Sequence, residues 1–92
     1  MKKTSAEDAV KELTLALMYL TRFSKKDRFY SSENNAWKGY AFRALDELEE
    51  EGYINQGSHR SKSVHIHDKG VEQARVLLEK YGIAEWEKIK DL

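Results

Sequence analysis

The chain has 92 residues, with 16 Lys and Arg against 16 Asp and Glu, so its formal net charge at pH 7 is zero. This length predicts one domain over residues 1–92, with a core at 5–82 and a C-terminal extension at 83–92. No apolar run approaches the roughly 20 residues of a membrane span. The absence of cysteine excludes disulfides, thiol catalysis and Cys-type zinc sites, and it fits a reducing compartment. We therefore expect a cytoplasmic protein with no membrane partner.

A first helix is predicted near the N-terminus, because Thr4 with Glu7, or Ser5 with Asp8, has the spacing of a capping box. Apolar residues then recur at spacings of three and four along one face: Ala6, Ala9, Val10, Leu13, Ala16, Leu17, Leu20 and Phe23. Leu15, Met18 and Tyr19 are apolar too but lie outside this face. So wide an apolar arc indicates either the central helix of a small core or a helix that a partner also covers.

Residues 24–35 are polar and show no period. They are interpreted as a surface loop or as a short helical turn starting near Ser32. Because Phe29 and Tyr30 are the only apolar anchors, we expect this to be the most mobile internal segment, with little regular structure.

A second helix is predicted from about Tyr40 to Glu51, with Ala41, Leu45 and Leu48 facing the core and Gly52 ending it. The next residues predict a β-hairpin, with strands at 53–55 and 63–67 joined by a long basic turn. In the second strand, Val64 and Ile66 alternate with His65 and His67 and so point to the opposite face.

A third helix is predicted to begin at Asp68 as N-cap and to end at Gly82. Its apolar stripe consists of Val71, Ala74, Leu77, Leu78 and Tyr81. A short C-terminal helix from Ala84 to Lys90, presenting Trp86, is expected to follow. The predicted fold class is α+β and mostly helical.

The order helix, undefined segment, helix, hairpin, helix resembles a winged helix-turn-helix domain, with a two-stranded hairpin as its wing and an extra C-terminal helix. The resemblance rests on Leu45, Leu48 and Gly52-Tyr53-Ile54, a basic hairpin tip, and Asp68-x-Gly70 before the third helix. It implies that the second helix presents side chains to the major groove while the wing contacts phosphates.

The chain also resembles a family of short bacterial proteins classed only as a domain of unknown function. The matching segments are Leu15 to Thr21, Ala36-Trp37-Lys38-Gly39-Tyr40, Leu45 with Leu48, Gly52-Tyr53-Ile54, and Lys62-Ser63-Val64 leading to Gly70. This resemblance covers roughly residues 8 to 82. It supports the fold and implies no activity.

The candidate nucleic-acid-binding residues are basic or aromatic and lie on the second helix and around the wing: Lys38, Tyr40, Arg43, His59, Arg60, Lys62 and Lys69. Against them, the outward face of the second helix carries three acids beside Arg43. Arg43 is therefore also read as half of an ion pair within the helix, with Asp46 or Glu47.

His65 and His67 share one strand face and could hold a metal with His59 or Asp68, but two histidines without a clear third ligand are more simply solvent-facing. Trp37 is expected to close the core, with stacking on a base or ligand as the alternative. No catalytic constellation and no phosphate loop are present, so we expect no enzyme activity, no cofactor and no small-molecule substrate.

A homodimer is predicted through the first helix and the tail, because one small core cannot easily cover all their apolar residues. The residues assigned to this interface are Leu15, Met18, Tyr19, Ile83, Trp86 and Ile89. The alternative is a monomer whose tail folds back onto the first helix.

Two functions follow from these patterns. The first is a winged helix that binds double-stranded DNA in transcription control. The second is a winged-helix-shaped protein-interaction or dimerisation module without DNA affinity. Fold shape favours the first, whereas the zero net charge favours the second.

Overall fold

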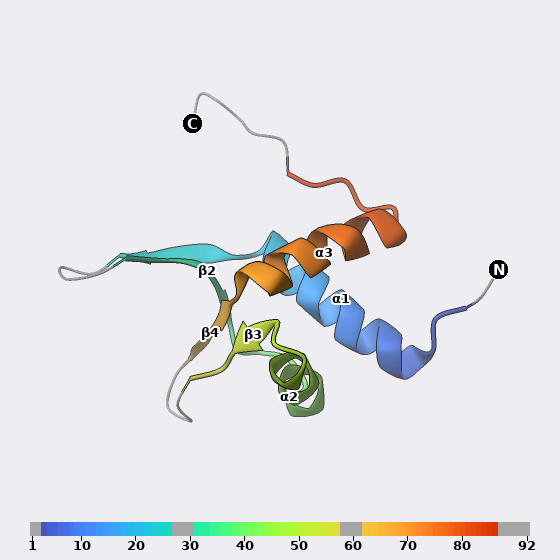
Figure 1. Cartoon of the computed structure of the whole chain (residues 1–92), viewed down its shortest axis with the longest axis horizontal. Coiled ribbons are helices and arrows are strands. Elements are labelled where there is room, and N and C mark those ends of the chain that lie inside the picture. Colours follow the sequence, from blue (N-terminus) through green and yellow to red (C-terminus); the bar gives the residue numbers. More distant parts are fainter. Residues whose placement is uncertain (1–2, 27–30, 58–61, 87–92) are drawn as a thin grey trace.

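The computed structural model describes residues 3–26, 31–57 and 62–86 (Figure 1). The elements in these ranges are, in chain order, α1 (Ala6–Leu20), β1 (Phe23–Lys26), β2 (Ser31–Trp37), α2 (Phe42–Glu50), β3 (Ile54–Asn55), β4 (Ser63–Ile66) and α3 (Asp68–Lys80). The predicted fold class, α+β and mostly helical, is confirmed.

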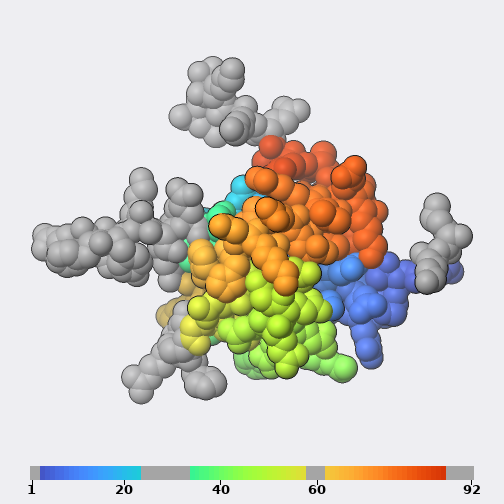
Figure 2. Space-filling model, viewed as in Figure 1, coloured from blue at the N-terminus to red at the C-terminus, as the bar shows by residue number. Residues whose placement is uncertain are grey.

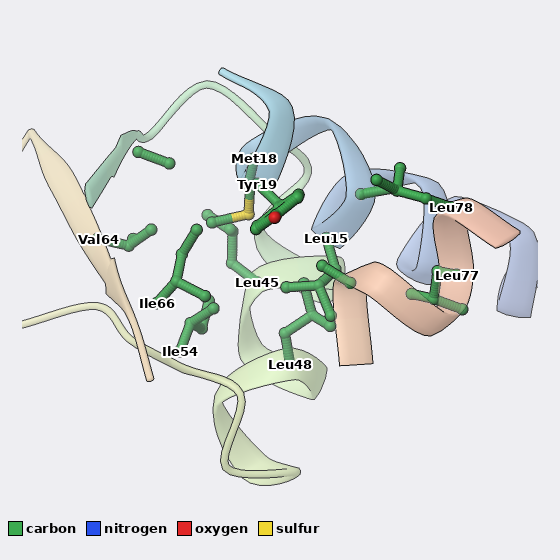
Figure 3. Packing of buried hydrophobic residues seen from close by; sticks show 13 residues of the cluster. Leu15, Met18, Tyr19, Leu45, Leu48, Ile54, Val64, Ile66, Leu77 and Leu78 are labelled. Carbon is green, nitrogen blue, oxygen red and sulfur yellow. The ribbon is translucent and has the colours of Figure 1, made fainter. Parts of the chain in front are cut away.

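The strands form one antiparallel sheet in the order β1-β2-β4-β3. Ala36 of β2 lies opposite Val64 of β4, and Ile66 of β4 lies opposite Ile54 of β3. Because side chains alternate along strands, these four residues share one face, here called the inner face. Figure 3 shows Ile54, Val64 and Ile66 pointing from the sheet toward the core side chains of the helices.

Most of the residues that α1 contributes to the core lie outside the predicted apolar stripe, which supplies the buried Ala16 and the partly buried Leu20. Leu15, Met18 and Tyr19 are fully buried among the inner-face residues of the sheet and the apolar residues of α2 and α3 (Figure 3). Their assignment to an exposed interface is therefore wrong. Apolar residues lie on both faces of α1. Most of those that recur at spacings of three and four lie on the outward face, so the spacing alone does not identify the face that the core covers.

The prediction of little regular structure for residues 24–35 is also wrong. Phe23–Lys26 and Ser31–Trp37 pair as strands, and β2 also pairs with β4. These two neighbours supply hydrogen-bond partners for the backbone of β2, whose polar sequence gives no sign of a strand. The register between β1 and β2 shifts past Phe23, and Asn34 there has a left-handed φ of 59°, as expected at a β-bulge. Residues 27–30, with Phe29, lie outside the described part of the chain.

The arrangement of α2, the β3–β4 hairpin and α3 is compatible with a winged-helix-like fold. In the three described ranges, however, no two helices are joined by a short turn, because the β1–β2 hairpin separates α1 from α2 (Figure 1). The helix-turn-helix part of the prediction is therefore not confirmed.

Most predicted helix ends are confirmed. The Ser5 side chain accepts a hydrogen bond from the backbone N–H of Asp8, and Gly52 and Gly82 both follow a helix with positive φ. The N-cap position of α3 is His67, whose side chain makes no capping hydrogen bond, so the predicted N-cap Asp68 is instead the first residue of the helix. Ala41 is the exposed N-cap of α2, so it does not face the core as predicted.

The part of the predicted C-terminal helix that the structure describes is not helical. Residues 83–86 have no helical structure, and the rest of the predicted helix lies outside the described residues. Instead, the segment lies against the end of α1: the Trp86 indole N–H donates to the carbonyl oxygen of Leu20 at 2.7 Å, and the buried Tyr19 hydroxyl donates to the Glu85 carboxylate.

Candidate nucleic-acid interface

The sheet has a second face that the described helices do not cover, here called the outer face. Asn35 of β2 lies opposite Phe23 of β1 and His65 of β4, and His65 lies opposite Asn55 of β3. Trp37 and Ser63 form the next opposed pair on the same side. The helices pack against the inner face, with Ala36, Val64 and Ile66 in the core. Among the residues whose side chains the structure describes, the outer face therefore consists of Phe23, Asn35, Trp37, Asn55, Ser63 and His65, and none of these six is acidic.

An aromatic platform stands on the outer face. The rings of Phe23 and Trp37 stack with centroids 4.6 Å apart and planes 27° apart, while 61% of Trp37 stays exposed. The prediction that Trp37 closes the core is therefore wrong. Its neighbour Ala36 occupies the inward position, and strand alternation turns the indole outward.

Polar groups lie beside this platform and line a shallow hollow formed by Asn35, Asn55, Gln56, Gly57, Ser63, Val64 and His65. Asn35 and Ser63 are buried within the sheet. The Nδ1 atom of His65 is buried and has no hydrogen-bond partner among the described residues. Amide and imidazole groups can both donate and accept hydrogen bonds, so the hollow can match the edge of a flat polar heterocycle.

Two of the predicted basic residues lie at the edge of this face. The backbone N–H of Lys38 donates to the carbonyl oxygen of Lys62 at 2.8 Å, which places the two lysines side by side where β2 and β4 meet. Lys38 follows Trp37 and Lys62 precedes Ser63. Two positive charges therefore border the aromatic platform, as a phosphate backbone would require.

The remaining predicted residues are engaged elsewhere or are not described. Tyr40 packs against the core. The Arg43 guanidinium lies 3.3 Å from Glu47 and 4.0 Å from Glu7, so the ion-pair prediction for Arg43 is confirmed. The Lys69 ammonium donates to the carbonyl oxygen of Glu51 at the end of α2. His59 and Arg60 lie outside the described residues.

The chain was compared with known proteins. The family described as "Domain of unknown function (DUF6429)" matches residues 6–84. The chain belongs to this family. It is 32% identical over 71 residues to "Uncharacterized protein y4hR" of Sinorhizobium fredii (strain NBRC 101917 / NGR234), over 77% of this chain and 85% of that protein. No solved structure matches the chain.

Membership of DUF6429 confirms the predicted resemblance to short uncharacterised bacterial proteins. The matched region includes α1, the whole sheet and α3, and so contains every residue of the outer face. The site described above is therefore part of the family's own domain.

Two further predictions concern ligands and membranes. In the described ranges, no group of three or more His, Cys, Asp or Glu could hold a metal ion, although the rings of His65 and His67 meet edge-on at 5.4 Å. His59, a predicted third ligand, lies outside those ranges. None of the helices that the structure describes is long and apolar enough to cross a membrane.

The predicted interface residues of the tail differ in how far they are exposed. Ile83 is half-buried and packs against the core, whereas Trp86 is exposed. Ile89 lies outside the described residues.

Sequence reasoning did not select Phe23, Asn35, Asn55 or Ser63. The available signal was the alternation of Asn35-Ala36-Trp37, in which a small apolar residue separates two residues of a different kind. Three residues are too few to distinguish a strand with an aromatic outer face from a loop.

Proposed function

We propose that this protein is a non-catalytic nucleic-acid-binding protein whose outer face binds a single strand. The observation that carries the proposal is the exposed Trp37–Phe23 stack on a sheet face whose six described side chains include no acid. Exposed aromatic rings on an open sheet are typical platforms for unpaired bases.

Each part of the outer face has a role in this proposal. Trp37 stacks on one base, while the hollow beside it hydrogen-bonds the edge of the next base through His65 and the exposed Asn55. Lys38 and Lys62 contact the phosphates. Since two lysines supply a limited electrostatic contribution and the net charge of the chain is zero, we expect micromolar affinity at low salt.

Reading of a duplex groove by α2 is less well supported. The exposed side of α2 carries Asp46, Glu49 and Glu50, and its one arginine is paired with two carboxylates. Such a helix repels phosphates. We therefore assign the strand-binding role to the sheet and propose transcription control as the process, with a transcript or a separated DNA strand as the ligand.

The test is fluorescence anisotropy with labelled single-stranded RNA and DNA of mixed sequence, and with duplex DNA, at about 50 mM salt. Trp37→Ala should weaken single-strand binding about 5- to 150-fold, because stacking on an aromatic ring contributes about 1–3 kcal/mol per base. Phe42→Ala is the matched control, since Phe42 is 80% exposed but lies on α2. No binding by the wild type, or equal losses in both variants, would contradict the proposal.

The lysines are tested by salt dependence. Lys38→Ala combined with Lys62→Ala should flatten the slope of log affinity against log salt by about 1.4, or 0.7 for each lost single-strand phosphate contact. Arg43→Ala should leave the slope unchanged. If Arg43→Ala flattened it and the lysine pair did not, α2 would be the binding element.

A further inference from the structure

α1 has a second apolar face, opposite to the one in the core. At 100° per residue, every residue of α1 within one arc of about 100° is apolar. These residues, here called the outward stripe, are Ala6, Ala9, Val10, Leu13, Leu17 and Leu20. Val10, Leu13 and Leu17 are 53%, 43% and 48% exposed. Leu20 packs partly against the core, so the described part of the chain leaves the middle of this apolar face, from Val10 to Leu17, largely uncovered.

We infer that the outward stripe binds the same stripe of a second copy of this chain, as an antiparallel helix pair related by a two-fold axis. A continuous apolar face of this kind is a typical contact surface. A two-fold contact buries the same patch on both copies, so the patch must complement itself.

The sizes of the side chains meet that requirement. With the two-fold axis at Leu13, antiparallel pairing brings Ala6 opposite Leu20 of the second copy and Ala9 opposite Leu17. Small residues occupy the N-terminal half of the stripe and large ones the C-terminal half. Antiparallel pairing therefore places a large side chain against a small one at both ends of the stripe. Parallel pairing would place leucine against leucine at one end and alanine against alanine, with a gap, at the other.

Neighbouring apolar surface extends the contact. Trp86, fixed to the carbonyl oxygen of Leu20, lies exposed at the C-terminal end of the stripe. Beside Val10, a groove between α1 and α2 is lined by apolar Ala41 and Ala44 and by charged residues of both signs. The groove and Trp86 would each border the second copy.

The expected affinity follows from the size of the contact. The 15 residues of α1 extend about 22 Å, at 1.5 Å per residue. A single helix pair of that length buries less than the roughly 800 Å² per partner of a standard stable interface. We therefore expect a dissociation constant in the micromolar range.

This inference does not rest on the proposed function. Leu15, Met18 and Tyr19 hold the other face of α1 against the sheet, so the outward stripe and the outer face lie on different sides of the molecule. Dimerisation through α1 leaves both outer faces free. Either proposal can therefore fail without the other.

The first test is analytical ultracentrifugation between about 1 μM and 500 μM, a range chosen to bracket a micromolar dissociation constant. The wild type should shift from monomer to dimer, and Leu13→Glu should remain monomeric with unchanged circular dichroism. Val76→Glu is the control, since Val76 is 58% exposed on α3, and it should dimerise normally. A wild-type monomer throughout, or a dimer that survives Leu13→Glu, would overturn the inference.

The second test fixes the orientation and does not require a disruptive change. The chain has no cysteine, so any disulfide that forms must join the single cysteine introduced into each copy. Leu13→Cys should oxidise rapidly to a linked dimer, because a disulfide needs Cα atoms about 4.4–6.8 Å apart. A mixture of Ala9→Cys and Leu17→Cys should give mainly the mixed dimer. Cross-linking of Leu13→Cys no faster than that of Val76→Cys would reject the two-fold contact.

Discussion

At the scale of single residues, Gly70 shows how closely the hairpin and α3 approach each other. Gly70 is buried in the first turn of α3, and a Cβ placed on it would lie 2.2 Å from the carbonyl oxygen of Tyr53 and 2.9 Å from Ile66 Cγ2. That carbonyl also accepts a hydrogen bond from the backbone N–H of His67. Glycine at this position thus allows the start of β3 to pack directly on the helix.

Gly70→Ala should therefore destabilise the protein by about 2 kcal/mol, since overpacking typically costs about 1–3 kcal/mol and outweighs the better helix propensity of alanine. Gly39→Ala is the matched control, because a Cβ there meets nothing within 4 Å. Urea unfolding of both variants measures the difference. Equal stability of Gly70→Ala and the wild type would show that the hairpin can move away from α3 without cost.

At the scale of elements, a polar contact joins α1 to α3 beside the core. The Glu12 carboxylate accepts hydrogen bonds from the Lys80 ammonium at 2.7 Å and from the Tyr81 hydroxyl at 2.6 Å. Burial acts to raise the pKa of Glu12, but these two hydrogen bonds outweigh it and hold the pKa below its ordinary value of 4.5. The same contact raises the pKa of Lys80 and of Tyr81.

This contact should make stability depend on pH. A carboxyl whose pKa is lowered by folding stabilises the folded state above its ordinary value of 4.5, and this contribution is lost as the pH falls through the folded pKa. Glu12→Gln should therefore be less stable than the wild type at pH 7, with the difference shrinking below about pH 4. Thermal unfolding from pH 3 to 7 measures this, with the exposed Glu79→Gln as control for the loss of one charge. A difference that stays constant across that range would contradict the assignment.

The elements also differ in how far the sequence predicts them. The sequence predicts α3 well, because its apolar stripe and Gly82 agree with the structure and its predicted N-cap, Asp68, is off by one residue. The helical period located α1, but period alone cannot select between two apolar faces, and Leu15, Met18 and Tyr19 were assigned outward. β2 was missed since Ser31 to Asn35 have low strand propensity, and its structure depends on pairing with Phe23 and with β4.

At the scale of the whole molecule, the position of the candidate site follows from the sheet order. β2 lies between β1 and β4, so Trp37 comes to stand between Phe23 and the His65 strand although the three are separated in sequence. Lys38 and Lys62 were predicted as nucleic-acid contacts from their charge alone. The aromatic platform beside them could not be predicted without this pairing, because Trp37 in isolation is more often a core residue.

The two proposed binding surfaces, the outer face of the sheet and the outward stripe of α1, lie on different sides of the molecule and differ in chemistry. The sheet's outer face is polar, aromatic and bordered by lysines, whereas the outward stripe of α1 is wholly apolar. The core side chains Leu15, Met18 and Tyr19 lie between the sheet and the outward stripe, so neither surface obstructs the other. Figure 2 shows the side of the molecule on which α3, in orange, packs beside the green and yellow-green α2 and β3 region. A dimer formed through α1 would thus present two strand-binding faces, which would strengthen binding to a strand long enough to reach both.

The most direct test of the central claim is a two-dimensional NMR titration of the labelled protein with a short single-stranded oligonucleotide at low salt. The largest shift changes should fall on the Trp37 indole N–H, the Asn35 and Asn55 side-chain amides, and the backbone amides of Ser63 and His65. Arg43 and the other residues of α2 should change little. Changes concentrated on α2, or none at millimolar oligonucleotide, would contradict the assignment of strand binding to the outer face of the sheet.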